Sequence, residues 1–269
     1  MPELPEVETI KNELSPHVIG RLIIGIAVDD EKLIKPYSTG EFCQQLLGQK
    51  ITSLERRGKY LFFHLSRGKL LVLHLRMTGL LTINSKGSKR STRAVLQFDN
   101  GDELAFIDRR RLGVMRLVGS MDEITKKLGI EPLTTDFSAV TLAKKLKVRH
   151  APIKAVLLDQ TVVAGIGNMY ADEALFAARI HPSKEAEELS SREVKALYKA
   201  IVAVLKKAVA RKGASVDTYA RPSGEKGTAH DEFNVAHRRG KTCYICGTAI
   251  ERLAIRGRGS YFCPKCQKL

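Results

Sequence analysis

The first hydrophobic pattern along the chain is helical. Apolar residues recur three or four positions apart, which predicts a short helix after Pro5. These residues are Val7, Ile10, Leu14 and Val18. Pro16 and Gly20 are expected to end the helix, because proline cannot continue the hydrogen bonding of a helix interior and glycine favours its C-terminal end.

Between residues 21 and 118 the helical spacing gives way to short apolar runs separated by turn residues. The runs are RLIIGIAV, KYLFFHLS, KLLVLHLRM, LLTI, AVLQF and ELAFI, rich in the residues that favour strands. Asn100 and Gly101, in DNGDE, are a strong signal for a tight hairpin turn. The pattern predicts an antiparallel β-sandwich or barrel, and the flanking helices make the fold class α+β.

From about residue 122 onward, helical patterns replace the strands. They occupy SAVTLAKKLK, PIKAVLLDQ, NMYADEALFAARI and SSREVKALYKAIVAVLKKAVARKG. In the last segment Ser190 and Glu193 have the spacing of a capping box ahead of an apolar face. Residues 213–240 are glycine-rich and irregular, and an irregular stretch of this length is often functional.

The basic excess points to a particular kind of partner. The 269 residues include 45 Lys and Arg against 29 Asp and Glu, a net charge of +16. A basic surface can be merely a solvated one, but residues 238–269 carry eight Lys and Arg and a single acidic residue, Glu251. Clustered cations suit a polyanion whose phosphates they contact. No segment has the pattern of a basic amphipathic surface helix, so nucleic acid is favoured over acidic membranes.

The compartment follows from what the chain lacks and from its cysteines. No apolar run approaches the roughly 18 residues of a membrane span, and the acidic N-terminal stretch lacks the pattern of a signal peptide. Cys43 stands alone, while the other four cysteines fall within the last 27 residues, which is no disulfide framework. We therefore expect a soluble protein of the reducing cytoplasm.

The C-terminal cysteines have the spacing of a metal site. The pattern is CxxC, sixteen residues, CxxC, which fits one tetrahedral zinc held by Cys243, Cys246, Cys263 and Cys266. All four ligands come from the protein, so the predicted site is structural. Between the pairs, Arg256 and Arg258 flank a glycine at a predicted turn tip, which would make a rigid cationic finger. Zinc ribbons also bind proteins, so the metal alone does not establish DNA binding.

A glycine turn in AGIGNMYADEALF is the second candidate site. Gly165 and Gly167 resemble a dinucleotide-binding loop, but Tyr170 occupies the third glycine position, so that interpretation fails. A helix that opens at Asn168 would present backbone N–H groups to a phosphate. The alternative is an ordinary packing junction between two helices.

The third candidate is the N-terminal string MPELPEVET. Removal of Met1 would expose Pro2 as a secondary amine, and an α-amino group has a pKa of about 7.7–8.0 in model peptides. The positive end of the following helix would lower this pKa further. Such an amine attacks a sugar aldehyde to form an imine, and adjacent carboxylates carry the protons. The alternative is a frayed acidic leader.

Taken together, these stretches resemble the formamidopyrimidine-DNA glycosylase/endonuclease VIII family of bacterial base-excision repair enzymes. The strings MPELPEVET, RRGKY, HLRMTG, AGIGNMYADEALF, IHP and the terminal four-cysteine finger occur in the family's order across essentially the whole chain. ELPEVE is more similar to the formamidopyrimidine branch than to the endonuclease VIII branch. The resemblance implies a catalytic β-sandwich domain at 1–132, a helix–two-turn–helix domain with a lesion loop at 133–240, and a zinc finger at 241–269.

The resemblance also implies roles for individual residues. Pro2 would be the nucleophile, Glu3 its acid/base, Glu6 a contact to the flipped lesion and Lys59 a proton donor at the sugar. Around the DNA backbone, the implied phosphate contacts are Asn168, Lys154 and Arg258, the last also counted with the catalytic set. Met77 and Arg110 would fill the space left by the flipped base. Taken singly, Lys59 would more often be a solvated lysine and Met77 a core methionine.

Four departures from the family pattern concern lesion choice. Leu112 replaces the phenylalanine that completes the void-filling set, and RSTR replaces a histidine-containing segment, which leaves Arg93 as the implied DNA contact there. His237 lies near the position of an expected tyrosine, and the loop at 213–232 matches poorly. These changes leave Pro2 and Glu3 untouched and bear on the lesion range and the opposite-base preference. The alternative is a divergent paralogue that handles a different lesion or has weakened activity.

The sequence therefore predicts a bifunctional DNA glycosylase and abasic-site lyase. Its partner would be double-stranded DNA carrying oxidised purines or abasic sites, its cofactor one structural zinc ion, and its working form a monomer. Two alternatives stay open: the same chemistry on oxidised pyrimidines, and a non-catalytic binder of damaged DNA. A zinc-ribbon adaptor without nucleic acid fits the charge of +16 worst.

Overall fold

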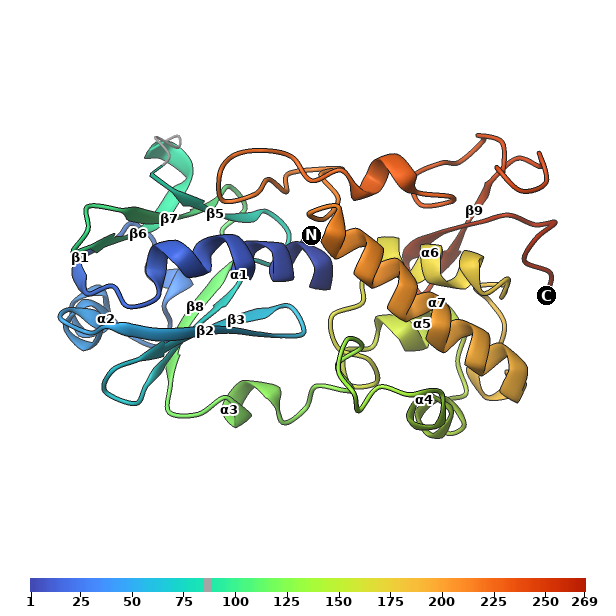
Figure 1. Ribbon diagram of the computed structural model, residues 1–269, viewed down its shortest axis with the longest axis horizontal. Coiled ribbons are helices and arrows are strands. Elements are labelled where there is room, and N and C mark those ends of the chain that lie inside the picture. Colours follow the sequence, from blue (N-terminus) through green and yellow to red (C-terminus); the bar gives the residue numbers. More distant parts are fainter. Residues whose placement is uncertain (85–88) are drawn as a thin grey trace. The chain divides into compact units, whose positions relative to one another are not determined.

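The chain folds into two compact units (Figure 1). The computed structural model describes residues 1–84 and 89–269. The sheet unit comprises Met1–Lys126 and Arg211–Thr228, and the helical unit comprises Lys127–Ala210 and Ala229–Leu269. The sequence places the boundary six residues later and the whole irregular loop in the second domain. The contacts instead assign residues 211–228 to the sheet unit.

The sheet unit is a sandwich of two antiparallel four-stranded sheets, as the sequence predicts. One sheet has the order β1 (Ile23–Val28), β6 (Thr92–Phe98), β7 (Glu103–Asp108), β5 (Gly79–Ile83). The other has the order β2 (Ile51–Arg57), β3 (Tyr60–Leu65), β4 (Leu70–His74), β8 (Val114–Val118). Buried side chains from both sheets form one core that includes Phe63, Leu73, Phe98 and Phe106.

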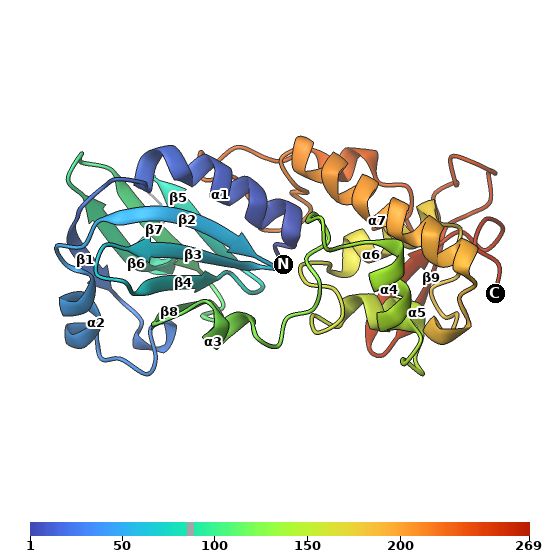
Figure 2. The same ribbon diagram turned by 60° about the horizontal axis from the view of Figure 1, so that its bottom comes forward.

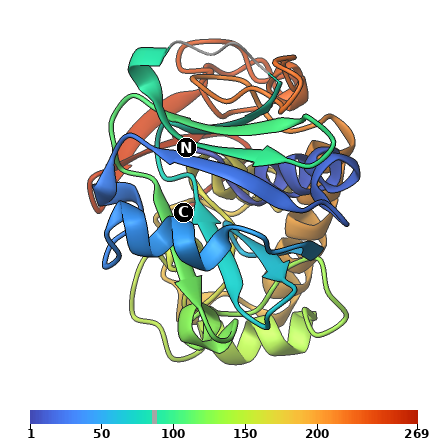
Figure 3. The same cartoon turned by 90° about the vertical axis from the view of Figure 1, so that its left-hand side faces the viewer.

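Helices close the sandwich along one side and at one end. The apolar face of α1 (Leu4–Val18) is buried in the core and packs along β2 (Figure 2). Helix α2 (Thr39–Leu46), which contains the isolated Cys43, packs on β1 at the end of the sandwich that faces the viewer in Figure 3. A short helix, α3 (Asp122–Thr125), follows β8. The sequence pattern shows α1 but not α2.

Pro16 does not end α1, contrary to the prediction. The helix continues to Val18, and the N–H of Ile19 still donates to the carbonyl of Ser15 at 3.1 Å. Proline removes only the bond to the carbonyl of Asn12, and Asn12 is exposed, so water can hydrate that carbonyl. Gly20, with φ +81°, then turns the chain toward β1.

The helical unit contains α4 (Ala139–Leu146), α5 (Ile153–Leu158), α6 (Asn168–Ala177) and α7 (Ser191–Ala210), which match the predicted segments. The predicted capping box at α7 is formed: Ser190 donates its N–H to the Glu193 carboxylate at 2.8 Å, and the Glu193 N–H donates back to the Ser190 hydroxyl at 3.3 Å. Short 3-10 turns lie at Glu31–Leu33, Lys89–Ser91, Ala186–Glu188 and Ala229–Glu232. In the described part of the chain, no helix combines the length and apolar character of a membrane span.

Both predicted hairpin turns are present. Gly101 has φ +86° and donates to the Phe98 carbonyl at 3.0 Å between β6 and β7. In the C-terminal module, β9 (Glu251–Ile255) and β10 (Arg258–Phe262) are joined by Arg256 and Gly257, both at positive φ. Two consecutive residues at positive φ form a tight turn whose twist matches that of the two strands it joins.

Candidate active site and nucleic-acid interface

The N-terminal tip is ordered and buried, which excludes a frayed leader in this structure. Pro2 is buried, and Glu3 and Glu6 are 2% and 0% exposed at the start of α1. The Glu6 carboxylate accepts the N–H of Glu3 at 2.7 Å and the N–H of Ala214 at 2.8 Å. Glu6 therefore fixes the start of the helix and ties it to the loop at 211–228. With Met1 attached the Pro2 nitrogen is an amide, so a free amine at the tip requires removal of Met1.

Lys59 lies in the two-residue turn between β2 and β3. Gly58, at φ +57°, makes the turn possible, and Lys59 is 7% exposed. Tyr60 pairs with His74 across β3 and β4, and the two rings lie 4.5 Å apart. The turn therefore brings a lysine with a buried stem next to a buried histidine.

His74 lies in the HLRMTG string and is a candidate residue that the sequence analysis does not single out. Burial and the charges of Arg76 and Lys59 lower the pKa of His74 to about 3. Its Nδ1 accepts the N–H of Arg76 at 3.0 Å, so the neutral ring carries its proton on Nε2. His74 is thus a hydrogen-bond donor whose charge does not change at neutral pH. It lines a hollow on the outer face of the sheet with Tyr60, Val72, Arg76, Val114, Arg116 and Ile124.

The three predicted void-filling residues lie on two loops at the same end of the sandwich. Met77 is in the β4–β5 loop, and Arg110 and Leu112 are in the β7–β8 loop. Gly79 pairs with Asp108, so the two loops leave the sheet side by side. Met77 and Leu112 are 38% and 42% exposed, which excludes the interpretation of Met77 as a core residue.

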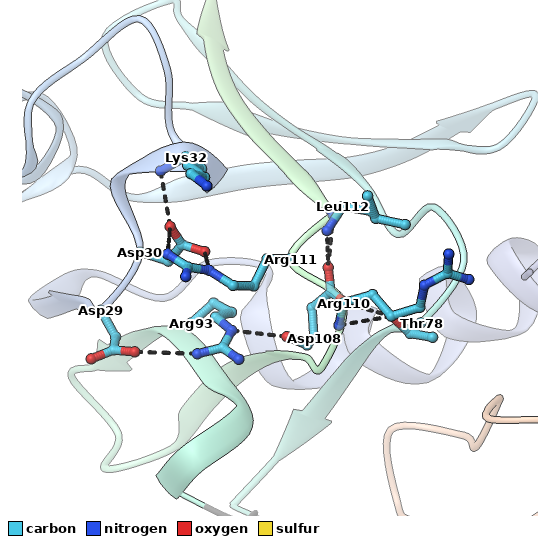
Figure 4. A network of polar contacts seen from close by, with 10 residues as sticks. Asp29, Asp30, Lys32, Thr78, Arg93, Asp108, Arg110, Arg111 and Leu112 are labelled. Carbon is cyan, nitrogen blue, oxygen red and sulfur yellow. Dashed lines mark hydrogen bonds and ion pairs between the residues drawn. The ribbon is translucent and has the colours of Figure 1, made fainter.

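Arg93, the predicted DNA contact on β6, has partners within its own unit. Its Nε donates to the carbonyl of Asp108 at 2.8 Å, and Nη1 lies 3.4 Å from Oδ2 of Asp29 (Figure 4). The side chain is 12% exposed. Arg90, in the neighbouring 3-10 turn, is exposed. The role of Arg93 in DNA binding stays a prediction, and the structure gives it a second role in supporting the β7–β8 loop.

The loop at 211–228 is closed on itself and docked on the sandwich. Thr228 donates to the Arg211 carbonyl at 2.9 Å, which joins the two ends of the loop. Tyr219 is 6% exposed within the sandwich core, and its hydroxyl donates to the carbonyl of Lys212 at 3.0 Å. Arg221 Nε lies 2.7 Å from the carboxylate of Glu13 on α1. These contacts explain why the loop belongs to the sheet unit.

In the helical unit, the glycine turn before α6 has the predicted form. Gly165 has φ +88°, Gly167 is the N-cap, and the helix begins at Asn168. Asn168 Nδ2 donates to the carbonyl of Gly259 on the finger at 3.0 Å. The start of α6 and the finger hairpin are therefore fixed to each other inside this unit.

Lys154 shares the same carbonyl acceptor from a fully buried position. Its Nζ donates to the Gly259 carbonyl at 2.8 Å and lies 2.7 Å from Oδ1 of Asp172 on α6. Both side chains of the ion pair are 0% exposed. Burial raises the pKa of Asp172 to about 7 despite the nearby ammonium group. The geometry makes Lys154 a support beneath the finger, and the phosphate contact that the resemblance implies for it stays a prediction.

Replacing Lys154 by methionine is expected to destabilise the helical unit. The substitution leaves Asp172 buried without its partner, a change that costs about 3–5 kcal/mol of unfolding free energy. Urea denaturation monitored by circular dichroism measures the loss. Lys206→Met, at an exposed position on α7, is the matched control and should change stability by no more than about 0.5 kcal/mol. An equal effect of the two substitutions would show that the buried pair is unimportant.

Glu173 is a second residue that sequence reasoning missed. Its buried carboxylate accepts three successive backbone N–H groups, from Asn234 at 2.9 Å, Val235 at 2.8 Å and Ala236 at 2.9 Å. No local sequence pattern marks Glu173, because its hydrogen-bond partners lie about sixty residues further along the chain. Glu173 therefore holds the segment that leads into the finger. His237, at φ +60°, follows and packs its ring 5.6 Å from that of Tyr261.

The finger has an exposed arginine and a cluster of four thiols, as the sequence predicts. Arg258 is exposed at the start of β10, directly after the turn. The four Sγ atoms lie within 4.8 Å of one another. Cys243 and Cys266 are 3.9 Å apart, and Cys246 and Cys263 are 3.4 Å apart. A tetrahedral zinc with Zn–S bonds of about 2.3 Å separates its sulfur ligands by about 3.8 Å, so the cluster fits one structural zinc ion.

These features define a class: proteins that combine a buried N-terminal proline and glutamate with a glycine turn at a helix start and a four-cysteine finger. Family models match the chain in the same order. They are the formamidopyrimidine-DNA glycosylase N-terminal domain over residues 1–115, its H2TH domain over 128–220, and a zinc finger found in FPG and IleRS over 240–269. The chain belongs to the formamidopyrimidine-DNA glycosylase family, as the resemblance implies.

Curated relatives and solved structures agree with this assignment. A formamidopyrimidine-DNA glycosylase of Symbiobacterium thermophilum is 42% identical over 99% of this chain and 89% of its own length. One from Desulforamulus reducens is 41% identical over 100% and 99%. A Lactococcus lactis FPG mutant in complex with Fapy-dG DNA superposes with a TM-score of 0.92 at 34% identity, over 100% of both chains. MutM in complex with carbocyclic 8-oxo-G DNA gives 0.91 at 34% identity, also over 100% of both.

Proposed function

We propose that this protein excises oxidised purines from double-stranded DNA through an imine on Pro2 and then cleaves the strand at the abasic site. The observation that carries the proposal is the buried tip, in which Pro2 precedes two buried glutamates at the positive end of α1. A helix N-terminus favours a neutral amine over a charged one, and a neutral amine is the nucleophile. The bacterial relatives named formamidopyrimidine-DNA glycosylase supply the lesion class.

The steps follow from the chemistry of a secondary amine. After removal of Met1, the Pro2 nitrogen attacks C1′ of the flipped nucleotide, the bond from C1′ to the base breaks, and the base leaves with a proton. The Pro2 N–H proton passes to Glu3 and from there to O4′ as the C1′–O4′ bond breaks, and a cationic imine (an iminium ion) joins Pro2 to C1′. Loss of a C2′ proton expels the 3′ phosphate, a second elimination expels the 5′ phosphate, and water releases the enzyme. Flipping is required because C1′ and the base are shielded in the stack.

Groups around the tip supply positioning and charge. Lys59 donates a proton at the sugar, and neutral His74 beside it donates a hydrogen bond to a phosphate. Glu6 already accepts two backbone N–H groups, so it orients the lesion through the loop it holds. This extends the predicted role of Glu6 from direct contact to support of the loop at 211–228.

The helical unit binds the DNA backbone. Asn168 and the N–H groups at the start of α6 face a phosphate, and exposed Arg258 binds a second one. Lys154 acts from below by holding the Gly259 carbonyl. Cys243, Cys246, Cys263 and Cys266 would hold a zinc ion that stabilises the finger and takes no part in bond breaking, because four thiolates would fill its coordination shell. We place the enzyme in the bacterial cytoplasm and infer that it works as a monomer, since one chain carries the full set of proposed groups.

A panel of single-lesion duplexes tests the proposed function. We expect excision and strand cleavage at 8-oxoguanine and formamidopyrimidine opposite cytosine, and slower turnover of an oxidised pyrimidine. Gel analysis of end-labelled strands separates glycosylase from lyase products, because each elimination leaves a different terminal phosphate. Faster turnover of the oxidised pyrimidine than of the purines would show that the enzyme has endonuclease VIII-like specificity. Binding without any cleavage, on a chain shown by mass to lack Met1, would identify a non-catalytic binder.

A further inference from the structure

One buried carboxylate lies where the β4–β5 and β7–β8 loops meet. Asp108, the last residue of β7, is 0% exposed (Figure 4). Its Oδ2 accepts the N–H groups of Leu112 at 2.8 Å and Gly113 at 2.7 Å. Its Oδ1 accepts the N–H of Arg110 at 3.1 Å and the hydroxyl of Thr78. Four donors from two loops therefore converge on a single side chain.

The two loops have little freedom to rearrange around this carboxylate. A Cβ atom at Gly79 would lie 2.5 Å from the Leu75 carbonyl oxygen, and one at Gly113 would lie 2.5 Å from the Phe106 ring. Both positions therefore require glycine. Thr78 links the loops directly, because its hydroxyl also accepts the N–H of Arg110 at 3.3 Å. Met77 directly precedes Thr78, so these contacts fix the backbone next to it.

A second contact fixes Arg111, the residue between Arg110 and Leu112 in the β7–β8 loop. Arg111, at φ +56°, makes a two-point ion pair with Asp30, at 2.6 Å and 2.8 Å. Asp30 is 3% exposed, and its hydrogen bond to Arg111 lowers its pKa. Arg111 is therefore turned toward Asp30, although its side chain is still 48% exposed, and Arg110 and Leu112 on either side are exposed without this anchor.

We propose that Asp108 is a positioning residue for base flipping, which holds Met77, Arg110 and Leu112 as one preformed wedge. The inference rests on the proposed function, since it concerns the step that empties the stack before the chemistry. A wedge fixed before DNA binding loses little conformational freedom on insertion, so insertion is fast. Leucine offers no aromatic face for stacking, which makes the correct placement of Leu112 more important here.

Thr78→Val tests the wedge with little disturbance, because valine keeps the shape of threonine and removes only the hydroxyl. The probe is a duplex with 2-aminopurine opposite a tetrahydrofuran abasic-site analogue, whose fluorescence rises when the base opposite is unstacked. We expect Thr78→Val to slow this rise about three- to tenfold, the effect of one hydrogen bond. Thr78→Ser, which keeps the hydroxyl, is the matched control and should behave as the native chain.

Asp108→Asn tests the carboxylate itself. An amide has one acceptor oxygen for the four donors. We therefore expect the fluorescence rise of this variant to be about ten to a hundred times slower than that of the native chain. Asp102→Asn, the same substitution at a half-buried position in the β6–β7 turn, is the control. Imine formation on a single-stranded abasic site needs no wedge and should stay within about twofold of native in every variant.

The two readouts separate the possible failures. An unchanged fluorescence rise in folded Thr78→Val and Asp108→Asn would overturn the positioning role, as would an equal slowing of imine formation on the single strand. A native chain that gives no rise on the duplex would overturn the wedge. Failure of the proposed function would appear separately, as the absence of an imine on any abasic site.

Discussion

A chain that keeps any residue before Pro2 is expected to form no imine with abasic DNA, whereas the same chain with a free Pro2 is trapped covalently by borohydride. With a residue attached, the Pro2 nitrogen is an amide whose lone pair is delocalised, so it is neither basic nor nucleophilic. Loss of a catalytic nucleophile lowers the rate by at least roughly a thousandfold. Mass spectrometry of the trapped complex measures the yield and maps the linked residue.

The matched comparison uses one preparation before and after cleavage of an N-terminal tag that leaves Pro2 first. Pro2→Gly keeps an N-terminal amine but loses the secondary amine, so it should form the adduct more slowly. Lys59→Ala removes the other amine near the tip. Equal trapping of the tagged and cleaved chains, with the DNA attached to Lys59, would transfer the role of nucleophile to that lysine.

Removal of the metal is expected to abolish specific DNA binding. The four thiolates fix a finger whose small core includes Phe176, Val235 and Ile250, and zinc binding contributes about 10–16 kcal/mol of folding free energy in small zinc-finger peptides at neutral pH. Cys263→Ala, at a cysteine with 0% exposure, should lose the ion and leave Arg258 on a disordered segment. We expect DNA affinity to fall by at least about a hundredfold at fixed salt, since phosphate contacts are lost.

Cys43→Ala provides the control for this experiment. Cys43 lies in α2 of the sheet unit and belongs to no metal cluster among residues 1–84 and 89–269. This variant should keep one zinc per chain by elemental analysis and native affinity by fluorescence anisotropy. Metal-free Cys263→Ala that binds DNA as tightly as Cys43→Ala would show that the finger is dispensable for recognition.

Local patterns predicted the parts of the fold that depend on neighbouring residues. The apolar runs located six strands of the sandwich, and the helical periods located α4 to α7. Strand β2, with the sequence ITSLERR, alternates too weakly to stand out, and α2 is too short for its period to be convincing. Their places are decided by packing on the core. The cysteine spacing sufficed for the metal cluster, because a tetrahedral site is built from two short local turns.

Contacts between distant residues were beyond the reach of the sequence. Arg111 and Asp30 are 81 residues apart, and no local pattern marks either as a partner. Lysine is usually a surface residue, yet the fold buries Lys154 in an ion pair with Asp172. The loop at 211–228 appeared irregular because its order comes from α1 and the sandwich core, through Ala214 and Tyr219. In each case the deciding interaction is tertiary.

The hydrogen bond between Glu6 and Ala214 has a consequence for how the enzyme matures. Its partners are 208 residues apart, so at about 5–20 residues per second the ribosome needs roughly 10 to 40 s to make the second after the first. During that interval the N-terminus is outside the ribosome, and the loop at 211–228 that contacts it has not yet been made. An aminopeptidase can therefore reach Met1. In the finished fold Pro2 is buried. We therefore expect the initiator methionine to be trimmed fastest during synthesis, before the loop at 211–228 docks beside the tip.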